Sequence, residues 1–150
     1  MSADTLTRAR TSRTRALPTA PSTGVLVLRL ALGAILIAHG AQKIFQFGLA
    51  GASESFASMG IPLASVAAPV VAYVELIGGV AIVVGFATRI AAALAAVTLL
   101  VATFVVHLPF GIFVADNGFE LTLALAAVCI ALVATGAGKL SIDALLARRR

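Results

Sequence analysis

Residues 24–45 read GVLVLRLALGAILIAHGAQKIF, and this stretch decides the class of fold. It supplies the roughly 20 apolar residues that an α-helix needs to cross the hydrocarbon core of a bilayer. The apolar residues run on without alternating, which excludes a strand of a membrane β-barrel. Arg29 interrupts the run, and the run outlasts the apolar region of a signal peptide. We therefore expect a retained transmembrane helix.

Three more apolar segments of similar length follow, at about residues 66–86, 89–108 and 118–135. The chain is 61% hydrophobic and 11% charged, whereas a soluble domain is about 45–50% apolar and about 25% charged. The 150 residues allow one compact unit. The predicted fold is all-α: a polytopic membrane protein built as a bundle of four transmembrane helices.

Basic residues collect at the two ends of the chain and between the second and third apolar segments. Four arginines precede residue 16, Arg89 lies in the middle link, and Arg148–Arg150 close the sequence. The positive-inside rule then predicts a protein of the bacterial inner membrane with both termini in the cytoplasm. We expect a disordered basic tail over 1–23, the transmembrane domain over 24–143 and a basic tail over 144–150. Nucleic acid is not an expected partner.

The three links between the apolar segments differ in length and composition. Residues 46–65 contain Gly and Ser and are predicted to form a loop, with Phe56 and Met59 placing part of it on the membrane surface. Residues 85–89 predict a tight hairpin. Residues 108–118, LPFGIFVADNG, carry Pro and Gly turn signals.

Ionisable side chains within the apolar segments are few, which makes each of them a candidate for a role. Each costs about 2.5–3.5 kcal/mol on insertion scales, and such residues usually face the bundle interior or a cavity. The predicted topology places five of them in the outer leaflet: His39, Lys43, Glu75, His107 and Glu120. Arg29 lies toward the cytoplasmic side, where it and Arg89 are interpreted as structural or topology residues.

Helical periodicity places several of these residues beside small residues. Small side chains let helices approach closely, so these faces are expected to point inward. The predicted inward stripes are Arg29, Gly33, Leu36, Gly40 and Lys43; Ala68, Ala72, Glu75, Gly79 and Ile82; and Glu120, Ala124, Ala127 and Ala131. The result is a predicted polar pocket that opens to the outer side, with Lys43 facing Glu75 or Glu120. The alternative is that the same pairs only fix helix register.

No residue pattern predicts a self-sufficient catalytic site. The single cysteine, Cys129, forms no pair and is expected in the core. The histidines and carboxylates lack a tight ligand spacing, so no metal site is predicted. The catalytic residues, if the protein is an enzyme, are unknown from the sequence.

Short motifs follow one another in a specific order along residues 24–143. They include GAQK at 40–43, ELIGG at 75–79, GFATR at 85–89, His107 at the end of the third segment, GFE at 118–120 and GAGKLSID at 136–143. In this order the chain resembles the DoxX family of small four-helix membrane proteins.

The resemblance implies a membrane partner in redox metabolism, because related DoxD proteins are subunits of a thiosulfate:quinone oxidoreductase. The first hypothesis is therefore an accessory or quinone-interacting subunit of a sulfur or oxidative-stress redox system. It would have no intrinsic cofactor, and it would use a quinone, the lipid bilayer and a redox-enzyme partner, with self-association as a further hypothesis. The alternatives are a membrane scaffold that recruits a soluble partner and a small proton-coupled transporter.

Overall fold

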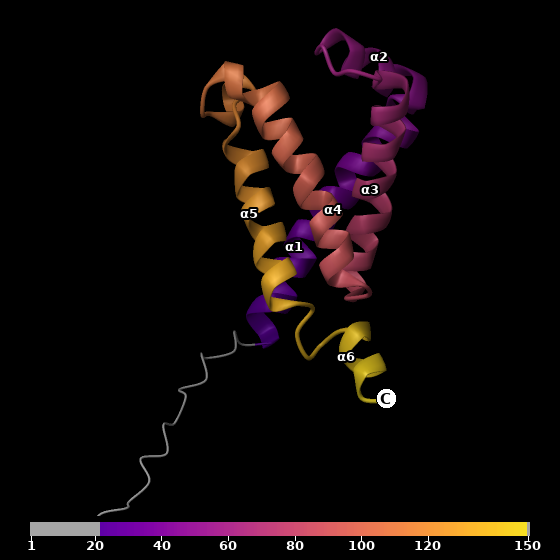
Figure 1. Ribbon diagram of the computed structural model, residues 1–150, viewed down its shortest axis with the longest axis vertical. Helices are drawn as coiled ribbons and strands as arrows, with labels where there is room; N and C mark the ends of the chain where they lie inside the picture. The colour runs from indigo at the N-terminus through magenta and orange to yellow at the C-terminus, as the bar shows by residue number, and fades with distance from the viewer. Residues whose placement is uncertain (1–21, 150) are drawn as a thin grey trace, which may run out of the picture.

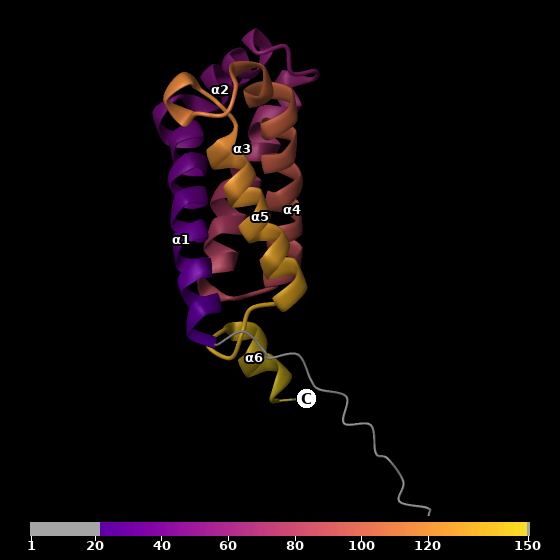
Figure 2. The same cartoon turned by 90° about the vertical axis from the view of Figure 1, so that its left-hand side faces the viewer.

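The computed structural model describes residues 22–149, which form a bundle of helices (Figure 1). The bundle consists of α1 (Ser22–Ala41), α3 (Ala64–Val84), α4 (Thr88–Val101) and α5 (Glu120–Thr135). The short helices α2 (Gly48–Ser58) and α6 (Ile142–Ala147) lie at opposite ends of the bundle, here called the α2 end and the α6 end (Figures 1 and 2). The π-helical segments η1 (Gln42–Gln46) and η2 (Ala102–His107) extend α1 and α4, and the 3₁₀ turns η3 (Leu108–Phe110) and η4 (Val114–Asp116) follow.

The predicted all-α membrane bundle is confirmed. Three helical stretches are long and apolar enough to cross a membrane: Ser22–Gln46, Ala64–Val84 and Thr88–Phe110. The fourth apolar helix, Glu120–Thr135, has 16 residues, so it covers about 24 Å at a rise of about 1.5 Å per residue. The turn before it exposes Phe113 and Val114, which continue the apolar surface beyond the end of the helix.

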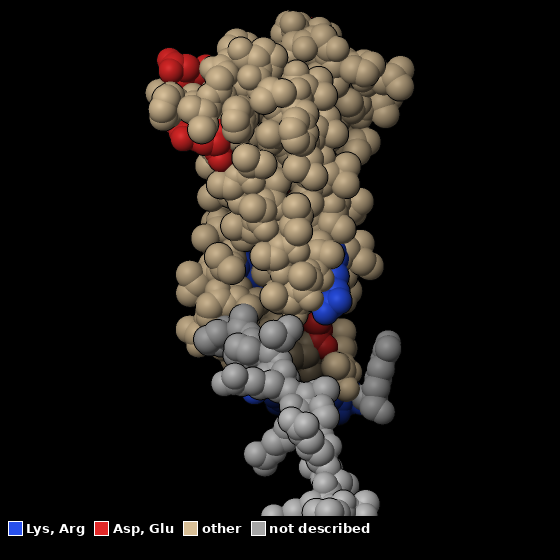
Figure 3. All heavy atoms as spheres, turned by 60° about the vertical axis from the view of Figure 1, so that its left-hand side comes forward, with Lys and Arg blue, Asp and Glu red and all other residues tan. Residues whose placement is uncertain are grey.

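The outer surface of the bundle is apolar, as a lipid solvent requires. Large side chains such as Ile77, Leu94 and Val97 are more than half exposed, although they lie away from the helix ends. Figure 3 shows an uncharged middle on the visible face, with acidic side chains near one end and basic side chains next to an acidic one toward the other. The protein is therefore a membrane protein, and hydrocarbon covers these side chains.

Helices α1 and α3 form the closest pair because glycines bring their backbones together. A Cβ on Gly40 would lie 2.5 Å from the backbone nitrogen of Leu76, and a Cβ on Gly79 would lie 2.9 Å from the carbonyl oxygen of Gly33. Any larger side chain at these positions would push the helices apart. The predicted inward stripes of α1 and α3 are confirmed for Arg29, Gly33, Leu36 and Gly40 and for Ala68, Ala72, Glu75, Gly79 and Ile82, all of which are buried.

Helices α4 and α5 form the second pair, with alanines of α4 packed in the same core as Cys129 and Leu132 of α5. The predicted core position of Cys129 is confirmed. Contacts between α1 and α5 are sparse. The two pairs diverge toward the α2 end, so the bundle has the outline of a V whose closed end carries α6 (Figure 1).

A buried arginine ties the closed end together. Arg29 of α1 is 1% exposed, and its guanidinium donates four hydrogen bonds to backbone carbonyls. Two acceptors, Ile82 at 2.8 Å and Val83 at 2.6 Å, lie in the last turn of α3; the other two, Ala137 and Leu140, both at 2.8 Å, lie in the segment after α5. The last carbonyls of a helix have no partner within the helix, so the arginine supplies donors to this end of α3, where the Ile82 carbonyl also accepts from the backbone nitrogen of Gly85 at 3.2 Å. We call Arg29 with these acceptors the Arg29 clasp.

Asp143 fastens the C-terminal segment to the start of α4. Its carboxylate accepts hydrogen bonds from the backbone nitrogens of Ala87 at 2.8 Å and Thr88 at 3.0 Å. Burial by itself would raise the pKa of Asp143, but the hydrogen bonds from Thr88 and Ala87 and the charge of Arg29 outweigh it and lower the pKa. The ionised carboxylate therefore stabilises the hairpin between α3 and α4.

Two predictions about the connections need correction or limits. The stretch 46–65, predicted as a loop, contains helix α2, because residues 48–58 pack on α3 and bury Ala52. The predicted disordered tail over 1–23 lies almost wholly outside the described residues, which begin with α1 at Ser22. Within the predicted C-terminal tail, α6 continues to Ala147.

Candidate ligand cavity at the α2 end

An ion pair joins α1 and α3 in the half of the bundle nearest the α2 end. Nζ of Lys43 lies 2.6 Å from Oε2 of Glu75, and the two side chains are 17% and 11% exposed. Lys43 follows the close contact at Gly40 by one turn, and Glu75 lies between Ala72 and Gly79 on the buried face of α3. The same close approach of α1 and α3 therefore positions both charges. Of the two predicted partners for Lys43, the structure selects Glu75.

A cavity of about 460 Å³ adjoins this ion pair, between the two helix pairs. Ligand sites commonly enclose about 300–1,000 Å³ with mostly apolar walls and a few polar groups. Apolar residues of α1, α3, α4 and α5 form most of the wall, including Ile35, Val71, Leu99 and Leu125. Phe56, Met59 and Ile61, at the end of α2 and in the turn after it, also line the cavity. The cavity is thus apolar with polar groups at defined places.

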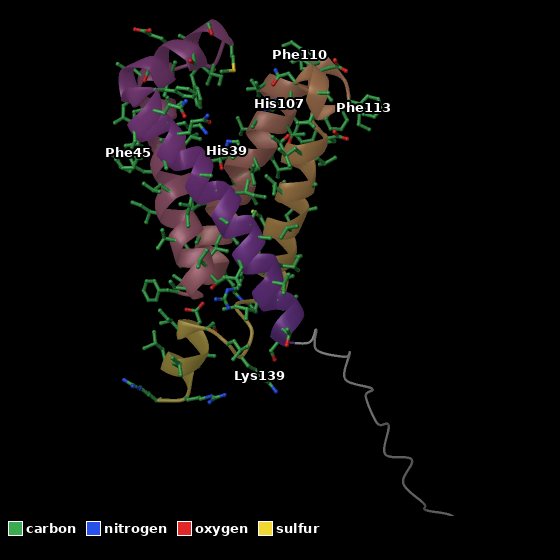
Figure 4. All side chains as sticks on the ribbon, turned by 180° about the vertical axis from the view of Figure 1, so that it is seen from behind. His39, Phe45, His107, Phe110, Phe113 and Lys139 are labelled. Atoms are coloured by element: carbon green, nitrogen blue, oxygen red, sulfur yellow. The ribbon has the colours of Figure 1, made fainter. Side chains whose placement is uncertain are left out.

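Both histidines line the same cavity and lie toward the α2 end, as Figure 4 shows. Nδ1 of His107 lies 2.8 Å from the backbone oxygen of Asn117. Because a carbonyl oxygen can only accept, we assign the proton to Nδ1, which leaves Nε2 of the neutral ring as an acceptor. His39 of α1 is an exposed residue. It borders the cavity from the α1–α3 pair, opposite His107 on the α4–α5 pair.

The two π-helical segments coincide with the cavity. Lys43 lies in η1, and Ala102, Val106 and His107 of η2 line the wall. π-helical turns are uncommon and occur frequently at functional sites. The wider turn changes the angle at which the following residues leave the helix, so α-helical periodicity predicts their directions poorly.

One of the five predicted pocket residues, Glu120, lies outside the cavity. Glu120 is exposed at the first turn of α5, where Oε1 accepts a hydrogen bond of 2.8 Å from the backbone nitrogen of Val114. The predicted inward stripe of α5 is wrong, because Ala124, Ala127 and Ala131 are exposed and α5 buries Ala126, Cys129 and Leu132 instead. Arg89 is also exposed, and its guanidinium nitrogen lies 3.4 Å from the carbonyl oxygen of Ala134, at the α6 end.

The structure adds polar groups that the sequence did not single out. Thr98, Thr122 and Asn117 line the cavity. The hydroxyl oxygens of Thr103 and Thr122 lie 2.8 Å apart and join η2 to α5. Threonines are common inside apolar segments, so the sequence pattern does not identify these as cavity residues. Only their position on the facing sides of α4 and α5 does so. Within residues 22–149, no group of three or more His, Cys, Asp or Glu side chains is placed to hold a metal ion.

Comparison with known proteins identifies the family of the chain. The sequence pattern of the DoxX family matches residues 24–108, which cover α1 through η2. The chain is 41% identical over 120 residues to the Bacillus subtilis protein named "Putative oxidoreductase CatD", which covers 80% of this chain and 84% of that protein. It is 35% identical over 126 residues to the Escherichia coli "Inner membrane protein YqjF", covering 84% of this chain and 94% of that protein. No solved structure matches.

The matched region includes the glycines that join α1 and α3, the ion pair and both histidines. The family pattern covers more than half of the chain, and the two relatives align with most of their own lengths. The chain belongs to the DoxX family of membrane proteins.

Proposed function

We propose that this protein is the quinone-interacting membrane subunit of a redox system in the bacterial inner membrane. The single observation that carries the proposal is the Lys43–Glu75 ion pair at the wall of an apolar cavity inside a membrane bundle. A quinone needs apolar walls for its ring and tail, a hydrogen-bond donor for a carbonyl oxygen and a group that exchanges protons. The name of the relative from Bacillus subtilis supports the redox assignment.

Each polar group has a part in this proposal. The ammonium group of Lys43 would donate a hydrogen bond to a quinone carbonyl oxygen, and Glu75 would carry a proton to or from the ring. Reduction of a quinone takes two electrons and two protons, and side chains of these types supply only protons. The electrons would come from a dehydrogenase that docks on the membrane subunit, so the activity belongs to the complex.

The charge distribution supports an orientation with the α6 end in the cytoplasm. Arg89, Lys139, Arg148 and Arg149 belong to that end, while Glu54 and Asp116 belong to the α2 end. A cysteine at position 54, in a chain whose buried Cys129 is replaced by Ala, should react with a membrane-impermeant thiol reagent added outside intact cells. Reaction only after the membrane is opened would reverse the proposed orientation.

The decisive experiment measures quinone bound to the purified protein. The tagged protein, extracted from its native membrane in mild detergent, is analysed by mass spectrometry for lipid-soluble quinone and for associated proteins. We expect quinone in the wild type and in Glu120→Gln, whose carboxylate lies outside the cavity, and a several-fold lower quinone content in Glu75→Gln. Absence of quinone from the wild type, or equal amounts in both variants, would reject the proposal.

A scaffold role is a second candidate because of the surface of α6. This segment exposes Leu140, Leu145 and Leu146 next to Arg148 and Arg149. Such a surface suits a soluble partner with an acidic rim around apolar residues. Exchanging Leu145 and Leu146 for Ser should release a co-purifying dehydrogenase without changing bound quinone. If the dehydrogenase stays bound, α6 is not its docking site.

A further inference from the structure

A second hollow lies on the outside of α1, next to the cavity. It is an open groove lined by Ala38, His39, Ala41, Gln42, Phe45 and Gln46. The three polar residues that line it, His39, Gln42 and Gln46, form a polar strip on an otherwise apolar surface. The groove therefore offers water a polar surface at the α2 end of the bundle.

His39 is the one residue that lines both the groove and the cavity. It therefore borders the outer groove and also the cavity that Glu75 lines. An imidazole can hold water on either side, and it can also accept a proton at one nitrogen and release one from the other. Among the other lining residues toward the α2 end, Phe56, Met59 and Ile61 are apolar, and the imidazole of His107 lies on the opposite helix pair.

We infer that water reaches the Lys43–Glu75 pair from the surface of the α2 end by passing His39, and that protons reach Glu75 by the same way. A proton that moves along it leaves an imidazolium nitrogen and ends on a carboxylate oxygen, with no other bond or electron changed. The charged or titratable side chains that line the cavity around His39 are Lys43 on the same helix stretch, Glu75 on α3 and His107 on η2. Those lining residues that belong to α5, which are Leu121, Thr122 and Leu125, carry none.

The inference deepens the proposed function, because it rests on Glu75 as the proton carrier. It also separates the two histidines. The ring of His107 is held by its bond to Asn117 and lines the cavity without lining the groove. His107 is therefore the natural comparison: it lines the same cavity with the same kind of ring but without contact to the outer strip.

A chemical cross-link tests the passage without any redox partner. A carbodiimide activates the Glu75 carboxyl group, the Lys43 amine displaces the urea, and an amide joins the two residues with loss of one water. The 2.6 Å contact makes this reaction favourable once the reagent arrives. A water-soluble carbodiimide reports access from water, and a lipid-soluble one reports access from the membrane and shows that the ion pair is intact.

In sealed vesicles, the water-soluble reagent should cross-link Lys43 to Glu75 in the wild type, in His39→Gln and in His107→Leu. In His39→Leu the cross-link should form several-fold more slowly, while the lipid-soluble reagent still forms it at the rate of the wild type. Equal rates of His39→Leu and wild type with the water-soluble reagent, or a loss in His107→Leu instead, would overturn the inference. If the lipid-soluble reagent also fails in His39→Leu, that variant has lost the ion pair itself, and the test rests on the other two variants. A cross-link with the water-soluble reagent that is slower in His107→Leu than in His39→Gln then overturns the inference, and wild-type rates in both support it.

The same measurements distinguish the passage from the proposed function. A cross-link that depends on His39 in a protein that binds no quinone keeps the passage and rejects the quinone proposal. If quinone binding depends on Glu75 but the cross-linking rate does not change in His39→Leu, the quinone proposal is kept and the passage is rejected.

Discussion

The buried charges at the two ends of the bundle differ in how many of their hydrogen-bonding groups have a partner. At the α6 end, Arg29 donates to four carbonyls and is 1% exposed. At the α2 end, Lys43 makes one ion pair with Glu75 beside a cavity. An ammonium group has three donor hydrogens and a carboxylate has about four acceptor sites, so both retain unused capacity. A charge that only holds the fold is saturated by backbone groups, whereas a charge available to a ligand keeps free donors and acceptors.

Removal of the Arg29 guanidinium should have the largest effect on stability. In Arg29→Met, four carbonyls in buried or partly buried bonds lose the arginine as donor, and each buried acceptor left unmet costs about 1–3 kcal/mol. We expect loss of most of the folded protein, measured as the monodisperse fraction after detergent extraction. Arg29→Lys, which keeps the charge but has fewer donors, should be intermediate. If Arg29→Met is as stable as the wild type, the clasp does not hold the closed end.

Separation of α1 from α3 should have the second largest effect. A Cβ on Gly40 would come within 2.5 Å of the backbone nitrogen of Leu76, and overpacking of this kind costs about 1–3 kcal/mol. Gly40→Ala should lower the melting temperature and also reduce the Lys43–Glu75 cross-link. Gly24→Ala is the matched control, because nothing lies within 4 Å of a Cβ at that position. Identical melting curves for both variants would contradict the close contact.

Disruption of the ion pair should destabilise the protein less than loss of Arg29. Hydrogen bonds to charged groups contribute about 1.5–3 kcal/mol, and solvent reaches part of this pair. Glu75→Gln should therefore melt only slightly below the wild type. The double variant Lys43→Met/Glu75→Leu should regain stability, because replacing both charges leaves no unpaired one, yet it should not regain bound quinone. If the double variant regains quinone, the pair has no part in binding.

Acidification should have the smallest effect, through Asp143. The folded state lowers the pKa of this carboxyl group from its ordinary value of 3.8, so its stabilising contribution is complete above that value and is lost as the pH falls through the lower, folded-state pKa. The melting temperature should decrease in this acidic range, and Asp143→Asn should flatten the decrease. Equal acid dependence of both proteins would remove Asp143 from the explanation.

Much of the α1–α3 half could be predicted from the sequence. The small residues at positions 33, 40, 72 and 79 mark the facing sides of the two helices, and the periodicity places Arg29, Lys43 and Glu75 on those sides. The partner of Lys43 was open between Glu75 and Glu120, because periodicity gives the side of a helix but not the neighbour that it meets. The choice follows from the contact of Gly40 with Leu76.

The α5 half could not be predicted in the same way. Alanines occur on several sides of this helix, so the stripe that contains Glu120 looked as suitable for burial as the stripe that contains Ala126 and Cys129. The turn that precedes α5 decides the rotation, since the carboxylate of Glu120 accepts from Val114 and stays at the surface. Helix α2 was missed because its Gly and Ser content is typical of a loop, and its packing on α3 overrides that preference.

The sequence by itself determined that the protein lies in a membrane, that four apolar segments form its bundle, and which side of α1 and α3 is buried. These properties depend on the length and periodicity of apolar residues, which are local. The tertiary structure decided that the Arg29 guanidinium binds backbone carbonyls, that Glu75 pairs with Lys43, and that His39 lies between a cavity and a groove. Those facts depend on the rotation and divergence of whole helices, which are set by contacts between residues far apart in the chain.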